Sequence, residues 1–177
     1  MEPFERAVRH VSVNTMAEDS VQGRGRSGPI AAGDLSLLFG RQRTTMVQLA
    51  RMLTGSNAVA EEVVQDAFVK LQQLRQAPDN PDGYLRTVVA NLSKSHLRRL
   101  RLERRLPATQ RTVFADPEID ETWEVLCRLP FRQRAVLALR FYNDLSEADI
   151  ARVLGCRPGT VKSSLHRGLA RLREELS

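Results

Sequence analysis

The residues best suited to binding chemistry lie in the segment RPGTVKSSLHRGLARLR, residues 157–173. The segment holds five Lys or Arg residues and no carboxylate. Cations and short hydroxyl groups on a helix are the groups that donate hydrogen bonds to base edges and phosphates. The pattern favours contact with DNA over the alternative, which is a solvated face on a small helical bundle.

The sequence around this segment predicts two short helices joined by a tight turn. Ser146 can cap the first helix, over 146–154, and Gly155 suits the left-handed residue that ends it. Pro158 is tolerated in the first turn of the second helix, over 158–176. The apolar residues of that helix fall on one side at about 100° per residue. The side chains expected to reach DNA from this helix-turn-helix are Thr160, Lys162, Ser163, His166 and Arg167.

The rest of the chain is also predicted to be helical, because no stretch alternates between apolar and polar residues as a strand does. We expect an all-α protein with two small helical domains on a flexible linker, the C-terminal one containing the helix-turn-helix. One helix, or two broken near Gly40, should start at Asp34. The other expected helices cover 58–75, 82–105, 118–129 and 131–143. The predicted division is a disordered extension over 1–33, a domain over 34–105, a linker over 106–117 and a domain over 118–177.

Two predicted helices of the N-terminal domain carry distinct polar faces. The helix over 58–75 presents Glu62, Gln65 and Asp66 opposite its apolar stripe, and taken alone this face would only be solvated. The helix over 82–105 carries a cationic stripe, which suits the backbone of partly melted DNA. The candidate contacts on that stripe are Tyr84, Thr87, Asn91, Lys94, Arg98 and Arg101. Tyr84 fits a core aromatic and a base-stacking ring equally well, whereas His96 is expected to be a buried histidine.

Composition narrows the function classes. The formal net charge of +6 favours a polyanionic partner. Cys127 and Cys156 form no CxxC pair, so neither a zinc site nor a disulfide framework is indicated. The sequence has no phosphate-binding loop, nucleophile elbow or HExxH motif, and we therefore expect no catalysis, no cofactor and no metal. No apolar run reaches the roughly 20 residues that cross a bilayer, and no signal peptide is evident, so we expect a cytoplasmic protein without membrane insertion.

Two stretches resemble the extracytoplasmic-function (group 4) sigma factors of bacterial RNA polymerase. RFYNDLSEADIARVLGCRPGTVKSSLHRGLARLR is similar to the C-terminal region of that family, and LTGSNAVAEEVVQDAFVKL to its N-terminal region. The resemblance covers roughly residues 35–102 and 118–175. The sequence differs from the usual family pattern at Ser164, where arginine is common, at Gly168, where alanine is common, and at Arg157, where a small hydroxyl residue is usual. We expect Ser164 on the flank of the second helix, so Ser164→Arg should tighten binding to promoter DNA if the side chain can reach a phosphate.

The resemblance implies a role for each surface. Glu62, Gln65 and Asp66 map onto the face that docks on the β′ clamp helices of core RNA polymerase, and the C-terminal domain onto the part that meets the β flap. The helix over 82–105 and the loop before it, 75–82, map onto the element that captures the −10 promoter region. The second helix of the helix-turn-helix maps onto the reader of the −35 element. An anti-sigma factor is a common partner in the family, but no residue here identifies one.

The residues leave one rival function open, a two-domain helix-turn-helix regulator that binds duplex DNA without the polymerase. Nothing in the sequence marks a ligand pocket or a dimerisation seam, which such a regulator would use. The sequence does not indicate the target promoters or the inducing signal, nor whether translation starts at Met1 or Met16.

Overall fold

The computed structural model describes residues 28–103 and 121–176, and every regular element in those ranges is a helix. The all-α prediction is therefore confirmed. The N-terminal half consists of α2 (Ala32–Thr54), α3 (Asn57–Gln72) and α4 (Pro81–Glu103). The C-terminal half consists of α5 (Glu121–Arg128), α6 (Phe131–Leu137), the π-helix η1 (Ala138–Tyr142), α7 (Glu147–Leu154) and α8 (Pro158–Glu175). The predicted linker over 106–117 and residues 1–27 of the predicted extension lie outside the described residues.

Helix α2 is continuous through Gly40, so the unbroken alternative is the correct one. A glycine costs a helix interior only about 1 kcal/mol relative to alanine, and the tertiary contacts of α2 outweigh that cost. The helix begins at Ala32, and the chain before it is folded as well. Ile30 packs against the core, and the Ala77 N–H donates to the Gly28 carbonyl at 2.7 Å. The folded region therefore starts before the predicted boundary at Asp34.

Three helices begin at a side chain that satisfies a free backbone N–H of the first turn. The Ser56 hydroxyl accepts from the Val59 N–H at 3.4 Å at the start of α3. The Asn80 side-chain oxygen accepts from the Gly83 N–H at 2.8 Å at the start of α4. The Ser146 hydroxyl accepts from the Asp149 N–H at 3.1 Å at the start of α7. Each cap satisfies one of the first-turn N–H groups that have no acceptor within the helix.

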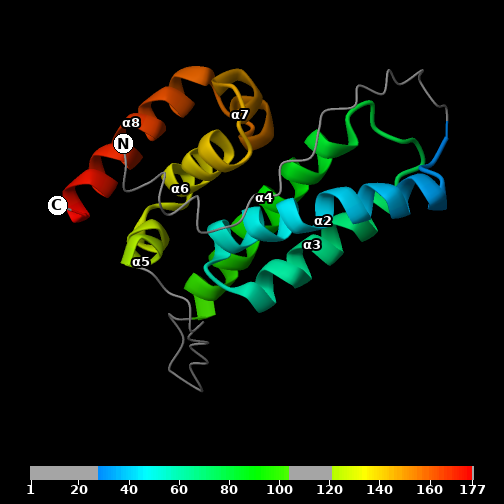
Figure 1. Cartoon of the computed structure of the whole chain (residues 1–177), viewed down its shortest axis with the longest axis horizontal. Helices are drawn as coiled ribbons and strands as arrows, with labels where there is room; N and C mark the ends of the chain where they lie inside the picture. The colour runs from blue at the N-terminus through cyan, green and yellow to red at the C-terminus, as the bar shows by residue number, and fades with distance from the viewer. Residues whose placement is uncertain (1–27, 104–120, 177) are drawn as a thin grey trace.

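The two halves pack against each other as well as within themselves. Figure 1 shows α2, α3 and α4 grouped together, with α5 to α8 forming a second group beside them. Helix α2 contacts α5, α6 and η1, and α4 contacts α7. The buried apolar residues of both halves form one hydrophobic cluster. Two helical domains are present, as predicted, and in this arrangement they share a core.

The predicted helix over 131–143 changes its winding partway. It is α-helical as far as Leu137 and continues as the π-helix η1 to Tyr142, where the Asn143 N–H donates to the Ala138 carbonyl. The chain then turns through Asp144, whose φ is 50°. The Arg140 guanidinium donates to the Leu145 carbonyl at 3.0 Å across this turn. The wider winding thus places the start of α7 next to the end of the preceding helix.

The cap of α7 gives a direct test of the local fold. Ser146→Ala should lower the free energy of unfolding by about 1 kcal/mol, because the Asp149 N–H loses its acceptor. Ser146→Thr keeps a hydroxyl oxygen and should stay within about 0.5 kcal/mol of the wild type. Urea denaturation followed by circular dichroism measures both, and an unchanged midpoint for Ser146→Ala would contradict the assigned cap.

Candidate functional site

The helix-turn-helix consists of α7, a three-residue turn and α8. Gly155 has φ 59° and ψ 44°, the left-handed conformation expected of a residue that ends a helix. The Cys156 N–H donates to the Ala151 carbonyl at 3.0 Å, which closes the turn before Pro158 opens α8. The predicted turn glycine and the predicted position of Pro158 are both confirmed.

The outer face of α8 is exposed along its first turns. Lys162, Ser163, His166 and Arg167 are exposed, and Thr160 is half-buried. Arg167 is held along the helix, since its Nε donates to the Ser163 carbonyl at 3.1 Å. The Ser163 hydroxyl in turn donates to the Thr160 carbonyl at 3.1 Å. The structure therefore brings all five predicted DNA contacts of this helix to one side of the molecule.

Ser164 differs from the sequence-based expectation. The expectation placed it on the helix flank, where an arginine could tighten contact with DNA. In the structure only 2% of Ser164 is exposed, and it lies on the buried side with Val161 and Gly168. That expectation is wrong because α8 packs closely on α6: a Cβ added to Gly168 would lie 3.0 Å from Leu137 Cδ1. Small residues are needed where the two helices approach this closely.

The predicted polymerase-docking face of α3 is exposed, as its position opposite the apolar stripe implies. Glu62, Gln65 and Asp66 all lie at the surface. Val69, one turn further along the same face, is also exposed, with 48% of its surface accessible. The sequence analysis gave Val69 no role. A single exposed apolar side chain is common on protein surfaces and does not by itself mark an interface.

The predicted −10 residues on α4 fall into two groups. Asn91, Lys94, Arg98 and Arg101 are exposed and line one pocket. Tyr84 and Thr87 are half-buried and lie outside it. Tyr84 packs against the hydrophobic cluster, and the Thr87 hydroxyl donates to the Gly83 carbonyl at 2.9 Å. The first group is available to a ligand, whereas the second also supports the fold.

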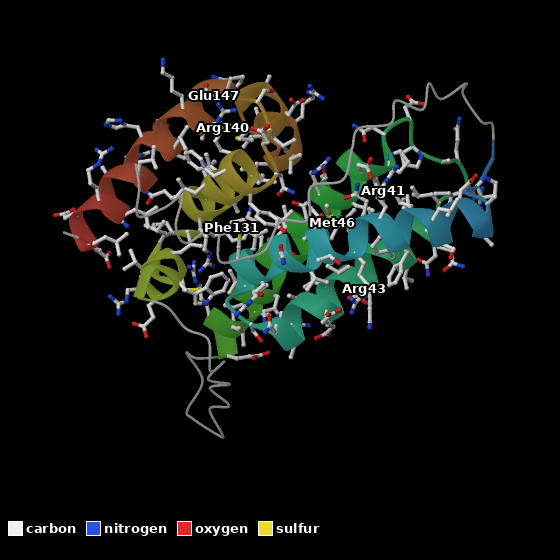
Figure 2. The ribbon with its side chains drawn as sticks, viewed as in Figure 1. Arg41, Arg43, Met46, Phe131, Arg140 and Glu147 are labelled. Atoms are coloured by element: carbon white, nitrogen blue, oxygen red, sulfur yellow. The ribbon has the colours of Figure 1, made fainter. Side chains whose placement is uncertain are left out.

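The pocket beside α4 includes residues that sequence reasoning did not single out. Phe131 and Arg132 from the start of α6 and Leu154 from the end of α7 line it opposite the α4 side chains. Figure 2 shows Phe131 where the two halves meet. No pattern within one helix indicates a surface formed by two halves, so the sequence carried no signal for it.

His96 lies half-buried on α4, consistent with the predicted inner stripe. Burial lowers the pKa of its imidazole, and the positive charge of Arg99 adds to the shift. The imidazole is therefore neutral near pH 7 and fits a packing role. Among the described residues, no group of three or more His, Cys, Asp or Glu side chains could hold a metal ion, and no helix is long and apolar enough to cross a membrane.

The structure alone indicates the class of protein, which is a two-domain helical protein whose helix-turn-helix presents an exposed basic face. Comparison with known families is more specific. Residues 38–103 match the family described as Sigma-70 region 2, and residues 119–172 match Sigma-70, region 4. The chain belongs to the extracytoplasmic-function group of the sigma-70 family of RNA polymerase sigma factors. Members of this family are DNA-binding proteins that direct the initiation of transcription.

Individual relatives agree with this assignment. The RNA polymerase sigma-E factor of Streptomyces avermitilis is 33% identical over 152 residues, covering 76% of this chain and 80% of the relative. The ECF RNA polymerase sigma factor SigM of Mycobacterium tuberculosis is 31% identical over 144 residues, covering 76% of this chain and 73% of the relative.

Solved structures agree in fold. The sigma factor RpoE in complex with the anti-sigma factor NepR from Bartonella quintana has a TM-score of 0.68 at 24% identity, covering 82% of this chain and 98% of that chain. CnrH in complex with the cytosolic domain of CnrY has a TM-score of 0.58 at 22% identity, covering 82% of this chain and 89% of that chain.

The burial of Ser164 predicts that an arginine at this position destabilises the fold. Ser164→Arg should lower the free energy of unfolding by about 3 kcal/mol or more, because it forces an unpaired charge into a position where only 2% of the residue is exposed. Ser163→Arg is the matched control, since the neighbouring side chain is exposed and should change stability by less than about 0.5 kcal/mol. Equal thermal stability of the two variants would contradict the placement of Ser164.

Proposed function

We propose that this chain is a cytoplasmic sigma factor that binds core RNA polymerase and selects promoters through separate −10 and −35 contacts. The observation that carries the proposal is the order of two sigma-70 regions along one chain, each with an exposed face suited to its role. The chain itself catalyses no step and holds no cofactor. An anti-sigma factor is a further partner that family membership supports.

The N-terminal half supplies the docking and −10 functions. On α3, Glu62, Gln65 and Asp66 form an acidic, exposed face around Val69, and complementary charges on the β′ clamp helices would orient it during encounter. On α4, Asn91, Lys94, Arg98 and Arg101 follow the backbone of the melted −10 region. Tyr84 and Thr87 support this helix from its half-buried side and lie nearest the preceding loop.

The C-terminal half supplies the −35 function. The exposed face of α8 enters the major groove, where Lys162 and Arg167 have the reach for bidentate contacts with guanine. Thr160, Ser163 and His166 lie on the same side and are short enough to read only the nearest base edges. The same half also meets the β flap of the polymerase.

The rival function, a helix-turn-helix regulator without the polymerase, predicts a different behaviour in solution. Such a regulator would bind duplex promoter DNA tightly by itself. A sigma factor should instead support run-off transcription only when core polymerase is present. Purified chain that shifts promoter DNA equally well with and without core enzyme would favour the regulator.

Docking is tested by a charge change on α3. The double variant Gln65→Ala with Asp66→Lys should slow association with core polymerase by about tenfold at low salt and less at high salt, because surface charges steer encounter. Glu174→Lys reverses another exposed carboxylate and should leave association unchanged. A double variant that associates at the wild-type rate, with unchanged circular dichroism, would remove this face from the interface.

Promoter reading is tested on α8 with a library of randomised −35 elements transcribed by core polymerase. Lys162→Ala or Arg167→Ala should relax discrimination at particular positions by about 1–3 kcal/mol per lost base contact. Arg171→Ala removes an exposed cation further along the helix and should at most weaken transcription evenly. Identical −35 preferences in all three variants and the wild type would contradict the role of α8.

A further inference from the structure

The pocket between the two halves has a volume of about 330 Å³. Helix α4 forms one wall, and the start of α6 and the end of α7 form the other. The volume lies at the lower end of the range for small-molecule sites. Since the lining comes from both halves, the pocket exists only when they are packed together as in Figure 2. We call it the interdomain pocket.

The charges around the interdomain pocket are all of one sign. Lys94, Arg98 and Arg101 line it from α4, Arg132 lines it from α6, and no carboxylate is part of the lining. Among residues 28–103 and 121–176, the ion pairs formed include none of these four side chains. Positive charges that line one pocket repel one another, although solvent and salt screen the repulsion between exposed side chains such as these.

Arg134, two residues after Arg132 on α6, is a buried cation. Burial lowers the pKa of its guanidinium, Cys127 raises that pKa, and the positive charge of Arg101 on α4 lowers it. Arg134 Nη1 donates to the Cys127 carbonyl at 2.8 Å. The excess of positive charge therefore spans both sides of the contact between the halves.

The remaining lining is apolar. Leu97 from α4 faces Phe131 and Leu154 from the C-terminal half, with Ala90 beside them. An inorganic anion would satisfy the cations but leave this apolar surface in water, whereas a neutral apolar molecule would leave the cations unpaired. The volume is far too small for duplex DNA. The chemistry of the lining fits a small organic anion with an aromatic or aliphatic body.

We propose that the interdomain pocket binds such an organic anion and that the bound anion holds the two halves together. The anion neutralises the repulsion between Arg132 and the cations of α4. Because the anion binds only when the halves are packed together, its binding stabilises the packed arrangement. A further consequence rests on the proposed function: the α4 cations assigned to the −10 element cannot reach promoter DNA while the pocket is occupied. Binding itself does not depend on that assignment.

The first experiment measures binding to the full chain by fluorescence, with anilinonaphthalene sulfonate as the anionic aromatic probe and phenylnaphthylamine as its uncharged counterpart. The anion should bind at one saturable site, and the uncharged probe about tenfold more weakly. Arg132→Ala should reduce affinity for the anion by about tenfold, as expected for the loss of one charged partner. Arg171→Ala, which removes an exposed arginine outside the pocket, is the matched control.

The second experiment asks whether the anion favours the packed arrangement. A Cβ added at Gly55, at the end of α2, would lie 3.3 Å from Cys127 Sγ in α5, which is close to disulfide geometry. In the Gly55→Cys, Cys156→Ser chain, the anion should at least double the rate of crosslinking to Cys127. The additional change Arg132→Ala should abolish this increase.

Gly55 has φ 79°, where a side chain is strained, so the crosslinking variant could fail to fold. Small-angle X-ray scattering of the wild type is the second measurement, and the anion should lower the radius of gyration. Equal anion affinity of wild type and Arg132→Ala, or equal affinity for the two probes, would overturn the site. Binding that leaves both the crosslinking rate and the radius of gyration unchanged would overturn its coupling to closure. Neither result bears on the transcription assays that test the proposed function.

Discussion

No residue of α2 between 45 and 54 is exposed, and the arrangement of the other helices depends on this burial. Met46, Leu49, Ala50 and Leu53 have no accessible surface. An amphipathic surface helix needs cover on one face only, but α2 also meets α5, α6 and η1 of the other half. Burying each large apolar side chain stabilises the fold by about 1.5–3 kcal/mol relative to exposure. The second half therefore supplies part of the core of the first.

Polar contacts lie at the edge of this shared core. The Arg51 guanidinium carbon, on α2, lies 4.8 Å from the centroid of the Trp123 ring on α5. Such a cation–π contact is worth about 0.5–1 kcal/mol at exposed sites and more when desolvated. Beyond that edge, α4 and α6 bring cations towards each other. The contact between the halves is thus favoured by apolar burial and opposed by charge, and a balance of this kind can be shifted by whatever binds the cations.

This balance affects the three proposed functional faces differently. The faces of α3 and α8 proposed for docking and for reading DNA are exposed with the halves packed together, and the α4 cations, although exposed, line the interdomain pocket. A partner can therefore engage α3 without any rearrangement. If α4 binds promoter DNA as proposed, the DNA competes with the C-terminal half for the side of α4 that lines the pocket.

Much of the fold was predictable from the sequence because each helix carries its own signals. Ser146 and Gly155 mark the ends of α7, and the apolar spacing of α8 places its exposed face correctly. The π-helix was not predictable, because its apolar residues fit the α-helical period until the last turn. The interdomain pocket was not predictable either, since its two walls carry no shared pattern in the sequence.

The sequence analysis placed Ser164 on the flank of α8, whereas the structure places it on the buried side. It follows Val161 by three residues and precedes Gly168 by four, so helical spacing puts it on the buried side. Its polar character favoured the flank. One turn further along the same side, Gly168 lets α8 lie close against α6, since a Cβ added there would be 3.0 Å from Leu137 Cδ1.

This close contact packs α8 against α6, the helix that also carries Phe131 and Arg132 into the interdomain pocket. Packed helices allow only small sliding movements, because larger shifts create voids or clashes. Under the proposed function, the helix that reads DNA is therefore packed directly on a helix that lines the pocket.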